Sequence, residues 1–126
     1  MMLMVENLYW IALCLYHECR GEPQEGQIAV AHVIMNRAIK RGKSVKEIIQ
    51  QPKQFSWLND GRPDDVVDHD AFVLCMESVV LARNERLEGK NFFGADHYFA
   101  DYIDQPSWAK NMTFIRKVGR HLFYRS

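Results

Sequence analysis

The sequence has only three cysteines among its 126 residues, Cys14, Cys19 and Cys75. So few thiols, odd in number, do not suit a disulfide framework, and they indicate a chain that folds where thiols stay reduced. The sequence also lacks an excess of charge, because 16 basic and 16 acidic residues cancel. This balance argues against a nucleic-acid-binding protein or a membrane-surface protein held by bulk electrostatics.

Long apolar runs are missing as well, since none approaches the roughly 20 residues that span a bilayer. The N-terminal stretch MMLMVENLYWIALCLY is apolar enough to raise the question of a signal peptide. It lacks a basic start, carries Glu6 and Asn7, and reaches His17 without a small-residue cleavage site. We therefore expect a core helix, no export signal, no stable membrane insertion, and synthesis in the cytoplasm.

The composition present is that of an ordinary globular protein, with 48% hydrophobic and 25% charged residues. It predicts a single domain over residues 1–126, which we expect to be a monomer. Apolar spacing and capping residues predict helices at residues 6–19, from Pro23 to about Gly42, at 44–51 and at about 68–88. The second of these is apolar nearly all round and should be the central buried helix.

The last third of the chain changes character, being rich in aromatic residues, Gly, Asp and Asn, without a sustained helical period. β-branched and aromatic residues on either side of Val118 and Gly119 indicate a hairpin. The fold class predicted is α+β, mostly helical, with a small β element in the C-terminal third.

Glu18 is the first candidate for chemistry. At 100° per residue it continues the apolar stripe of the first helix, in line with Ile11 and close to Leu15. A glutamate in a partly desolvated cleft has a raised pKa and can act as a general acid, as glycoside cleavage requires. From the pattern alone, an ion pair with Arg20 or a remote cation is the more ordinary role.

The neighbours of Glu18 favour structural roles. Glu22 precedes Pro23 at the start of the second helix, where a carboxylate suits the helix dipole and can cap exposed N–H groups. Arg20 and Arg37 are natural ion-pair partners for these acids. We expect the buried amide of Asn36 to bond a neighbouring backbone or side chain.

The cysteines are weaker candidates for metal binding or catalysis. Cys14, His17 and Cys19 are spaced like metal ligands, but on one helix the two cysteines splay to different faces, which suits no tetrahedral site. Cys19 with His97 or His121 could form the nucleophile and base of an amidase. A buried, inert cysteine is far more common. We expect no metal and no cofactor.

Aromatic residues gather in or near the predicted loops, mixed with hydrogen-bonding side chains. Such platforms bind amphipathic ligands, sugars among them, although any single aromatic ring is more often part of the core. The aromatic residues are Phe55, Trp57, Phe92, Phe93, Tyr98, Phe99, Tyr102 and Trp108, with Gln54, Ser56, Asn91 and His97 among them. Together they favour a cleft.

Several separated segments then resemble one family. HECRGEPQEGQIAVAHVIMNR resembles the E-A-R-G-E-x-x-x-G-Q-x-A-V-A-x-V-x-x-N-R signature of the SleB/CwlJ-type cell wall hydrolases, found in spore cortex-lytic enzymes and phage endolysins. QFSW, GADHYF, PSWA and VGRHLFY resemble further elements of that family, in the same order. The matches span residues 17–124.

The resemblance implies a lysozyme-like, peptidoglycan-cleaving domain whose essential acid is Glu18. It also implies that residues of the later motifs contact the glycan, namely Gln54, Phe55, Ser56, His97, Tyr98 and Trp108. Arg20, Glu22, Asn36 and Arg37 would hold the signature turn and the central helix. Two departures stand out, because Cys19 replaces the usual alanine and Asp96 the usual threonine, which leaves open whether Asp96 is a second acid.

Glycosidases ordinarily use two carboxylates, and no second acid stands out in the sequence. A lytic transglycosylase needs only one, because the muramyl C6 hydroxyl attacks its own C1. We therefore expect cleavage between N-acetylmuramic acid and N-acetylglucosamine by transglycosylation, in a phage endolysin that stays in the cytoplasm until it is released to the wall. The alternatives are a hydrolytic muramidase, a cysteine amidase, or a glycan-binding or structural phage protein without activity.

Overall fold

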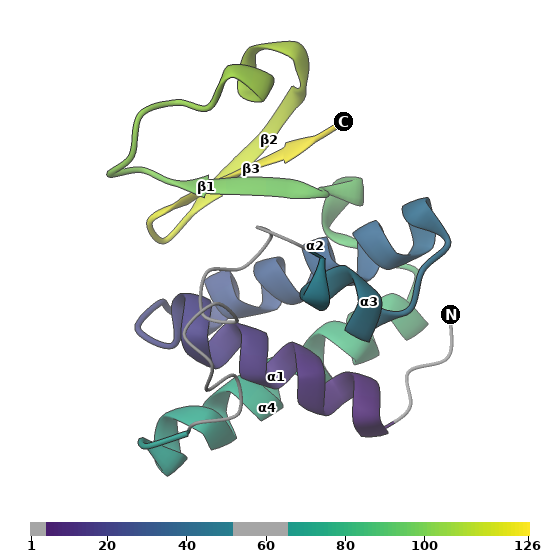
Figure 1. Cartoon of the computed structure of the whole chain (residues 1–126), viewed down its shortest axis with the longest axis vertical. Coiled ribbons are helices and arrows are strands. Elements are labelled where there is room, and N and C mark those ends of the chain that lie inside the picture. The colour runs from purple at the N-terminus through teal and green to yellow at the C-terminus, as the bar shows by residue number, and fades with distance from the viewer. Residues whose placement is uncertain (1–4, 52–65) are drawn as a thin grey trace.

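The computed structural model describes residues 5–51 and 66–126. Helices form one end of the molecule and a three-stranded sheet forms the other (Figure 1). The helices are α1 (Val5–Cys19), α2 (Gln24–Arg41), α3 (Val45–Gln50) and α4 (His69–Leu87). Their bounds lie within a few residues of those expected, and the α+β, mostly helical class is confirmed. None of the helices in these two ranges is long and apolar enough to cross a membrane.

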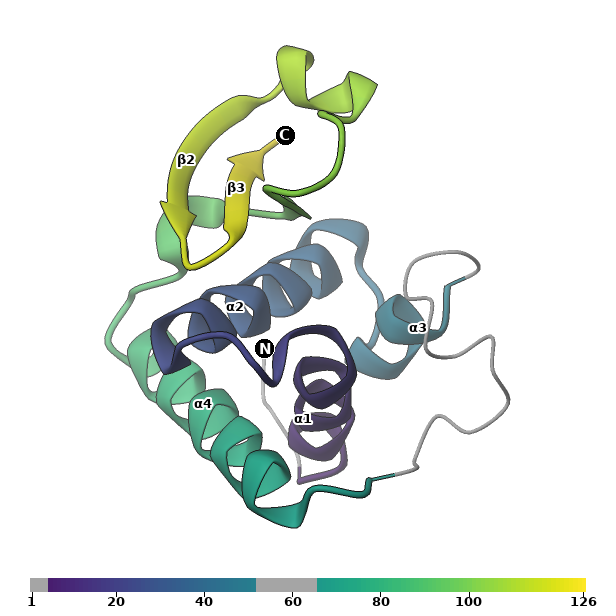
Figure 2. The same cartoon turned by 90° about the vertical axis from the view of Figure 1, so that its left-hand side faces the viewer.

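Helix α2 is the centre of the core, as its composition predicts. It contacts α1, α3 and α4, and its far side meets the sheet, so apolar residues cover most of its circumference (Figure 2). Val30, Val33 and Ile34 are fully buried there. Gly42 ends the helix in the left-handed conformation with φ of 62°, and the expected capping box of Ser44 and Glu47 starts α3.

The sheet contains β1 (His97–Ala100), β2 (Thr113–Val118) and β3 (His121–Arg125) in the antiparallel order β1-β3-β2. Strands β2 and β3 form the expected hairpin around Gly119, which has a φ of 57°. Short 3-10 turns, Phe92–Gly94 and Ser107–Asn111, precede β1 and β2.

The two faces of the sheet bury different side chains, because successive residues of a strand point to opposite sides. Tyr98 and Phe123 are paired across β1 and β3 and pack on the helical core. Residues of the other face form a separate small cluster, made of Phe99, Ala109 and Tyr124 with Trp108, Met112 and Leu122 packed against it. The sheet thus separates the predicted aromatic residues into two groups.

Polar side chains of α2 join the helices to the segment before β1. The Nδ2 of Asn36 donates to the carbonyl oxygens of Asn91 and Ala95, at 3.0 and 2.7 Å. The Nε of Arg37 donates to the carbonyl oxygen of Asp96 at 2.7 Å. These bonds confirm the partner expected for Asn36 and fix the start of the sheet on the central helix.

Candidate active site

The signature segment forms a tight corner between α1 and α2. Glu18 lies in the last turn of α1, and the backbone N–H of Glu22 donates to the carbonyl oxygen of Cys19 at 2.9 Å. Gly21 and Pro23 occur in this turn, where the sequence predicts the break between the helices. The corner therefore places Glu18 one residue before the end of α1.

The side chain of Gln27 binds the backbone of the corner on its buried side. It is fully buried, and its Nε2 lies 3.4 Å from the carbonyl oxygens of Cys19, Arg20 and Glu22. Its Oε1 accepts a hydrogen bond of 2.7 Å from the hydroxyl of Ser78 on α4. Gln27 was not predicted as a site residue, although a glutamine within the apolar run GQIAVAHVIM is itself a signal of a buried polar contact.

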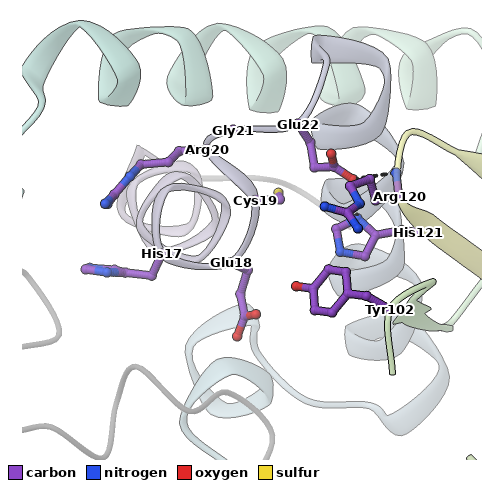
Figure 3. A pocket seen from close by; sticks show the side chains of 9 residues that line it. All are labelled: His17, Glu18, Cys19, Arg20, Gly21, Glu22, Tyr102, Arg120 and His121. Atoms are coloured by element: carbon purple, nitrogen blue, oxygen red, sulfur yellow. Dashed lines mark hydrogen bonds and ion pairs between the residues drawn. The ribbon is translucent and has the colours of Figure 1, made fainter. Parts of the chain in front are cut away.

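A pocket of about 340 Å³ opens beside Glu18 (Figure 3). Its walls come from the end of α1, the corner, the segment after β1 and the β2–β3 turn. The lining residues are His17, Glu18, Cys19, Arg20, Gly21, Glu22, Tyr102, Arg120 and His121. Segments more than 80 positions apart in the sequence, at Glu18 and Tyr102, thus meet at one site.

Glu18 has the electrostatic setting of a general acid. Burial raises the pKa of its carboxyl above the ordinary value, because the charged form loses hydration, while the positive charge of Arg37 opposes part of that rise. The side chain is only half-buried and lines the pocket, so a ligand there could reach it. This is the combination that proton donation to a glycosidic oxygen needs.

Glu22 fastens the hairpin to the corner. Its Oε1 accepts a hydrogen bond of 2.8 Å from the backbone N–H of Arg120 and lies 3.0 Å from Nδ1 of His121. The His121 contact is misaligned for a hydrogen bond, and no other described residue supplies one to that buried nitrogen. Burial lowers the pKa of His121, although the charge of Glu22 acts against it. The imidazole beside Glu22 is therefore neutral at pH 7.

The expected ion pair between Arg20 and the neighbouring acids is not what the structure shows. The guanidinium of Arg20 stands 4.4 Å from the centre of the Tyr16 ring, while His121 is the basic partner of Glu22. Arg20 points to the opposite side of α1 from Glu22 (Figure 3). The helix ends between the two residues, so adjacency in sequence does not bring their charged groups together.

Asp96 is held by several hydrogen bonds within the fold. Its side chain is buried, and its carboxylate accepts hydrogen bonds from Lys40 Nζ at 2.9 Å, His97 Nδ1 at 3.0 Å and the backbone N–H of Ser126 at 2.9 Å. Burial acts to raise the pKa of Asp96, but these bonds together lower it well below its usual range. It borders a different depression from that of Glu18.

The predicted glycan-contacting residues fall into three groups. Gln54, Phe55 and Ser56 lie outside the described residues. Tyr98 faces the helical core beside His121, with 5.1 Å between ring centres, and burial and the nearby charge of Glu18 raise the pKa of its phenol. His97 and Trp108 contact each other on the opposite face of the sheet, 5.0 Å apart.

The cysteines do not form a reactive centre. All three are buried, and burial raises the pKa of the Cys19 thiol well above its ordinary value, so the thiolate needed for nucleophilic attack is disfavoured. In residues 5–51 and 66–126, no group of three His, Cys, Asp or Glu side chains is placed to hold a metal ion.

Comparison with known proteins matches this chain to one family. The model of the family described as Cell Wall Hydrolase matches residues 21–124. The chain belongs to the cell wall hydrolase family. The resemblance drawn from the signature is confirmed, as is the enzyme family that it indicates. The family match begins just after Glu18, so the role of that residue depends on the pocket and on the signature itself.

Spore cortex-lytic enzymes are among the curated relatives. The one from Bacillus cereus is 30% identical over an alignment of 120 residues, with coverage of 93% of this chain and 43% of that protein. The one from Bacillus subtilis (strain 168) is 30% identical over an alignment of 119 residues, with coverage of 90% of this chain and 35% of that protein. The chain therefore spans less than half the length of these relatives.

Two solved structures share the fold over nearly the whole chain. One is the catalytic domain of the germination-specific lytic transglycosylase SleB from Bacillus anthracis, with a TM-score of 0.79, 28% identity, and coverage of 98% of this chain and 97% of that one. The other is the catalytic domain of the Bacillus cereus SleB protein, with a TM-score of 0.81, 28% identity, and coverage of 98% and 93%. The expected fold is confirmed by both.

Proposed function

We propose that this chain cleaves peptidoglycan glycan strands between N-acetylmuramic acid and N-acetylglucosamine, as a lytic transglycosylase in which Glu18 is the general acid and base. The observation that carries the proposal is the half-buried Glu18 carboxyl, with a raised pKa, at the wall of a pocket formed by the family signature. The likeness to a lytic transglycosylase catalytic domain over 98% of the chain supports the reaction class.

The reaction requires two proton transfers, one from Glu18 and one to it. Glu18 donates its proton to the oxygen that leaves C1 of the muramyl residue, and that C1–O bond breaks. The C6 hydroxyl of the same sugar then attacks C1, and the Glu18 carboxylate accepts the hydroxyl proton. The products are a 1,6-anhydromuramyl end and a free 4-hydroxyl on N-acetylglucosamine, without consumption of water.

The other acids near the site support a one-carboxylate mechanism. A hydrolase of the usual kind needs a second carboxylate roughly 5 to 10 Å from the first. Among the described residues, Glu22 is the other acid in the pocket, and it is engaged by Arg120 and His121. Asp96 is bound to Lys40 and borders a different depression. Intramolecular attack has a large effective molarity, so one acid suffices.

The glycan-contacting role predicted for Gln54, Phe55, Ser56, His97, Tyr98 and Trp108 remains part of the proposal. The role of Tyr98 at the site is supported by its electrostatic coupling to Glu18. His97 and Trp108 lie on the outer face of the sheet, so a strand that reaches them must extend past the edge of the pocket. Tyr98→Phe should therefore lower kcat, whereas Trp108→Ala should change KM alone.

The substitution Glu18→Gln tests the function. Lysis of purified peptidoglycan should fall at least a thousandfold, because the amide cannot donate a proton of suitable acidity, while the circular dichroism spectrum stays that of the wild type. Near-normal lysis would refute the role of Glu18. Release of peptides instead of sugar fragments by the wild type would favour an amidase, and strand binding without cleavage would favour an inactive glycan-binding protein.

As the biological setting, we propose a monomeric phage endolysin in which the whole chain is one catalytic unit. The phage members of the resembled family support this setting. Expression in a bacterial host should leave cells intact until a pore-forming protein is co-expressed, and lysis should then follow within minutes. Light scattering should give the mass of one chain. Activity restricted to spore cortex fragments would instead favour the setting of the curated relatives.

A further inference from the structure

Tyr102 and Arg120 form an exposed aromatic and cationic wall on the pocket of Glu18. Tyr102 follows β1 and Arg120 lies in the β2–β3 turn, and the guanidinium carbon stands 4.8 Å from the centre of the tyrosine ring. Tyr102 is 68% exposed and the side chain of Arg120 is 64% exposed. The two side chains contact each other and both line the pocket, where Figure 3 labels them.

The backbone of Arg120 is held on both sides. Its N–H donates to the carboxylate of Glu22 at 2.8 Å, and its carbonyl oxygen accepts from the N–H of Asp101 at 2.8 Å. Neither bond involves the side chain of Arg120. The main chain of Arg120 is therefore held beside the pocket by bonds that do not involve its side chain, and a substitution of the side chain leaves both bonds in place.

The guanidinium has donors available for a ligand. Its Nε lies 3.4 Å from Oδ1 of Asp101, whose other oxygen lies 3.1 Å from Nζ of Lys117. The two terminal nitrogens of Arg120 make no hydrogen bond to the described part of the chain. A planar guanidinium held in this way presents a pair of parallel N–H groups, which is the geometry that binds a carboxylate.

The other charged residues of the pocket are less suited than Arg120 to bind a carboxylate. Glu22 is engaged by the backbone N–H of Arg120 and by His121, and Glu18 is coupled to the charge of Arg37. Arg20 also lines the pocket, but it points away from Tyr102 to the far side of α1 (Figure 3). Arg120 is thus the cation on the same wall as Tyr102, whose hydroxyl end points toward Glu18.

We propose that Tyr102 and Arg120 form a subsite for a carboxylate carried by the muramyl residue of the strand. The tyrosine ring would pack on an apolar face of the ligand while the guanidinium pairs with the anion. The carboxylate is either that of the lactyl group, where the stem peptide has been removed, or one on the stem peptide itself. This inference rests on the proposed function, because it takes peptidoglycan as the ligand.

Binding to three forms of the glycan strand tests the subsite. The first form keeps its stem peptides, the second has them removed by an amidase, and in the third every carboxylate is converted to a neutral methylamide. Binding is measured in the Glu18→Gln background by calorimetry, so that no strand is cleaved. Arg120→Gln removes the charge, and Arg120→Lys keeps it without the planar fork. The matched control is Lys117→Gln, which removes the same charge from the other partner of Asp101 outside the pocket.

The expected result is that Arg120→Gln weakens binding about tenfold to whichever carboxylate-bearing strand binds more tightly, and leaves the methylamide strand unaffected. Arg120→Lys should recover part of the loss, and Lys117→Gln should stay within twofold of the parent. The better of the two carboxylate-bearing strands identifies the lactyl group or the stem peptide as the source. Equal affinities of Arg120→Gln and the parent for all strands, or an equal loss on the methylamide strand, would overturn the inference.

Lytic activity of the protein with Glu18 intact, measured on the same strands, separates this inference from the proposed function. If no sugar fragments are released but the charge-dependent binding is found, the proposed function fails and the subsite remains. If fragments are released and binding does not depend on Arg120, the subsite fails and the proposed function remains. Thermal unfolding of each variant confirms that the fold is retained.

Discussion

The carboxylate of Glu22 accepts a 2.8 Å hydrogen bond from the backbone N–H of Arg120, although the two residues are 98 positions apart. The approach is close, because a Cβ added at Gly119 would lie 2.9 Å from Oε1 of Glu22. The second acid of the signature therefore attaches the β2–β3 turn to the corner that carries Glu18. The shape of the pocket depends on this link.

Glu22→Ala should open the pocket. It removes the acceptor of the Arg120 N–H and the charge beside His121, so we expect a loss of about 1–3 kcal/mol in the free energy of unfolding and a fall of more than tenfold in lytic activity. Urea unfolding and peptidoglycan lysis measure the two effects. Glu25→Ala, at an exposed position in the first turn of α2, is the control and should change neither. Wild-type activity in Glu22→Ala would show that the link is dispensable.

Gln27→Leu should loosen the corner from within. Leucine has a similar size but leaves the hydroxyl of Ser78 and the carbonyl oxygens near Cys19 without their buried partner, which costs about 1–3 kcal/mol. Stability and kcat should fall together, and hydrogen exchange at the corner should accelerate. Gln24→Leu, one turn earlier on α2, provides the comparison. If Gln27→Leu were as stable and active as that control, Gln27 would have no role in the corner.

The raised pKa of Glu18 has a consequence for stability. The folded state holds the proton more tightly than the unfolded state, so the free energy of unfolding falls as pH rises from the ordinary carboxyl pKa of 4.5 through the folded value, and is constant above it. Glu18→Gln stays neutral and should be more stable than the wild type at pH 7. The difference in the free energy of unfolding between Glu18→Gln and the wild type should vanish below about pH 4. Lower stability of Glu18→Gln at pH 7 would contradict the burial of this charge.

The substitution Asp96→Asn tests whether Asp96 contributes to stability or to catalysis. Loss of the charge should lower the free energy of unfolding by about 2 kcal/mol, because the bonds from Lys40 and Ser126 weaken. The pKa of Asp96 is lowered in the fold, so its stabilising effect is present above the unfolded value of 3.8 and is lost as pH falls toward the folded one. Activity per folded molecule should stay within a few fold. An inactive but folded Asp96→Asn would make Asp96 a catalytic acid after all.

Local signals in the sequence predicted the helices well. The capping box at Ser44, the glycine at position 42 and the apolar stripes depend on residues that are neighbours along the chain, so pattern alone specifies them. The buried partner of Asn36 was also predictable, since a polar group in an apolar helix requires one.

Long-range contacts were not predictable in this way. The pairing of Glu22 with the β2–β3 turn, and the division of Tyr98 and Trp108 between the two faces of the sheet, depend on how distant segments meet. The expected pairing of Arg20 with its neighbouring acids was wrong for the same reason, because the end of α1 turns these side chains apart. Tyr102 and Arg120 gave no signal that linked them before the fold brought them together.

The mass of the products formed in water enriched in heavy oxygen distinguishes transglycosylation through Glu18 from hydrolysis. Purified peptidoglycan is digested by the wild-type protein, and the reducing ends are examined by mass spectrometry. Transglycosylation through Glu18 predicts 1,6-anhydromuramyl ends that lack one water and carry no heavy oxygen, and predicts that Glu18→Gln yields none. Ends heavier by one water, with the heavy oxygen incorporated, would show hydrolysis and contradict the one-carboxylate mechanism.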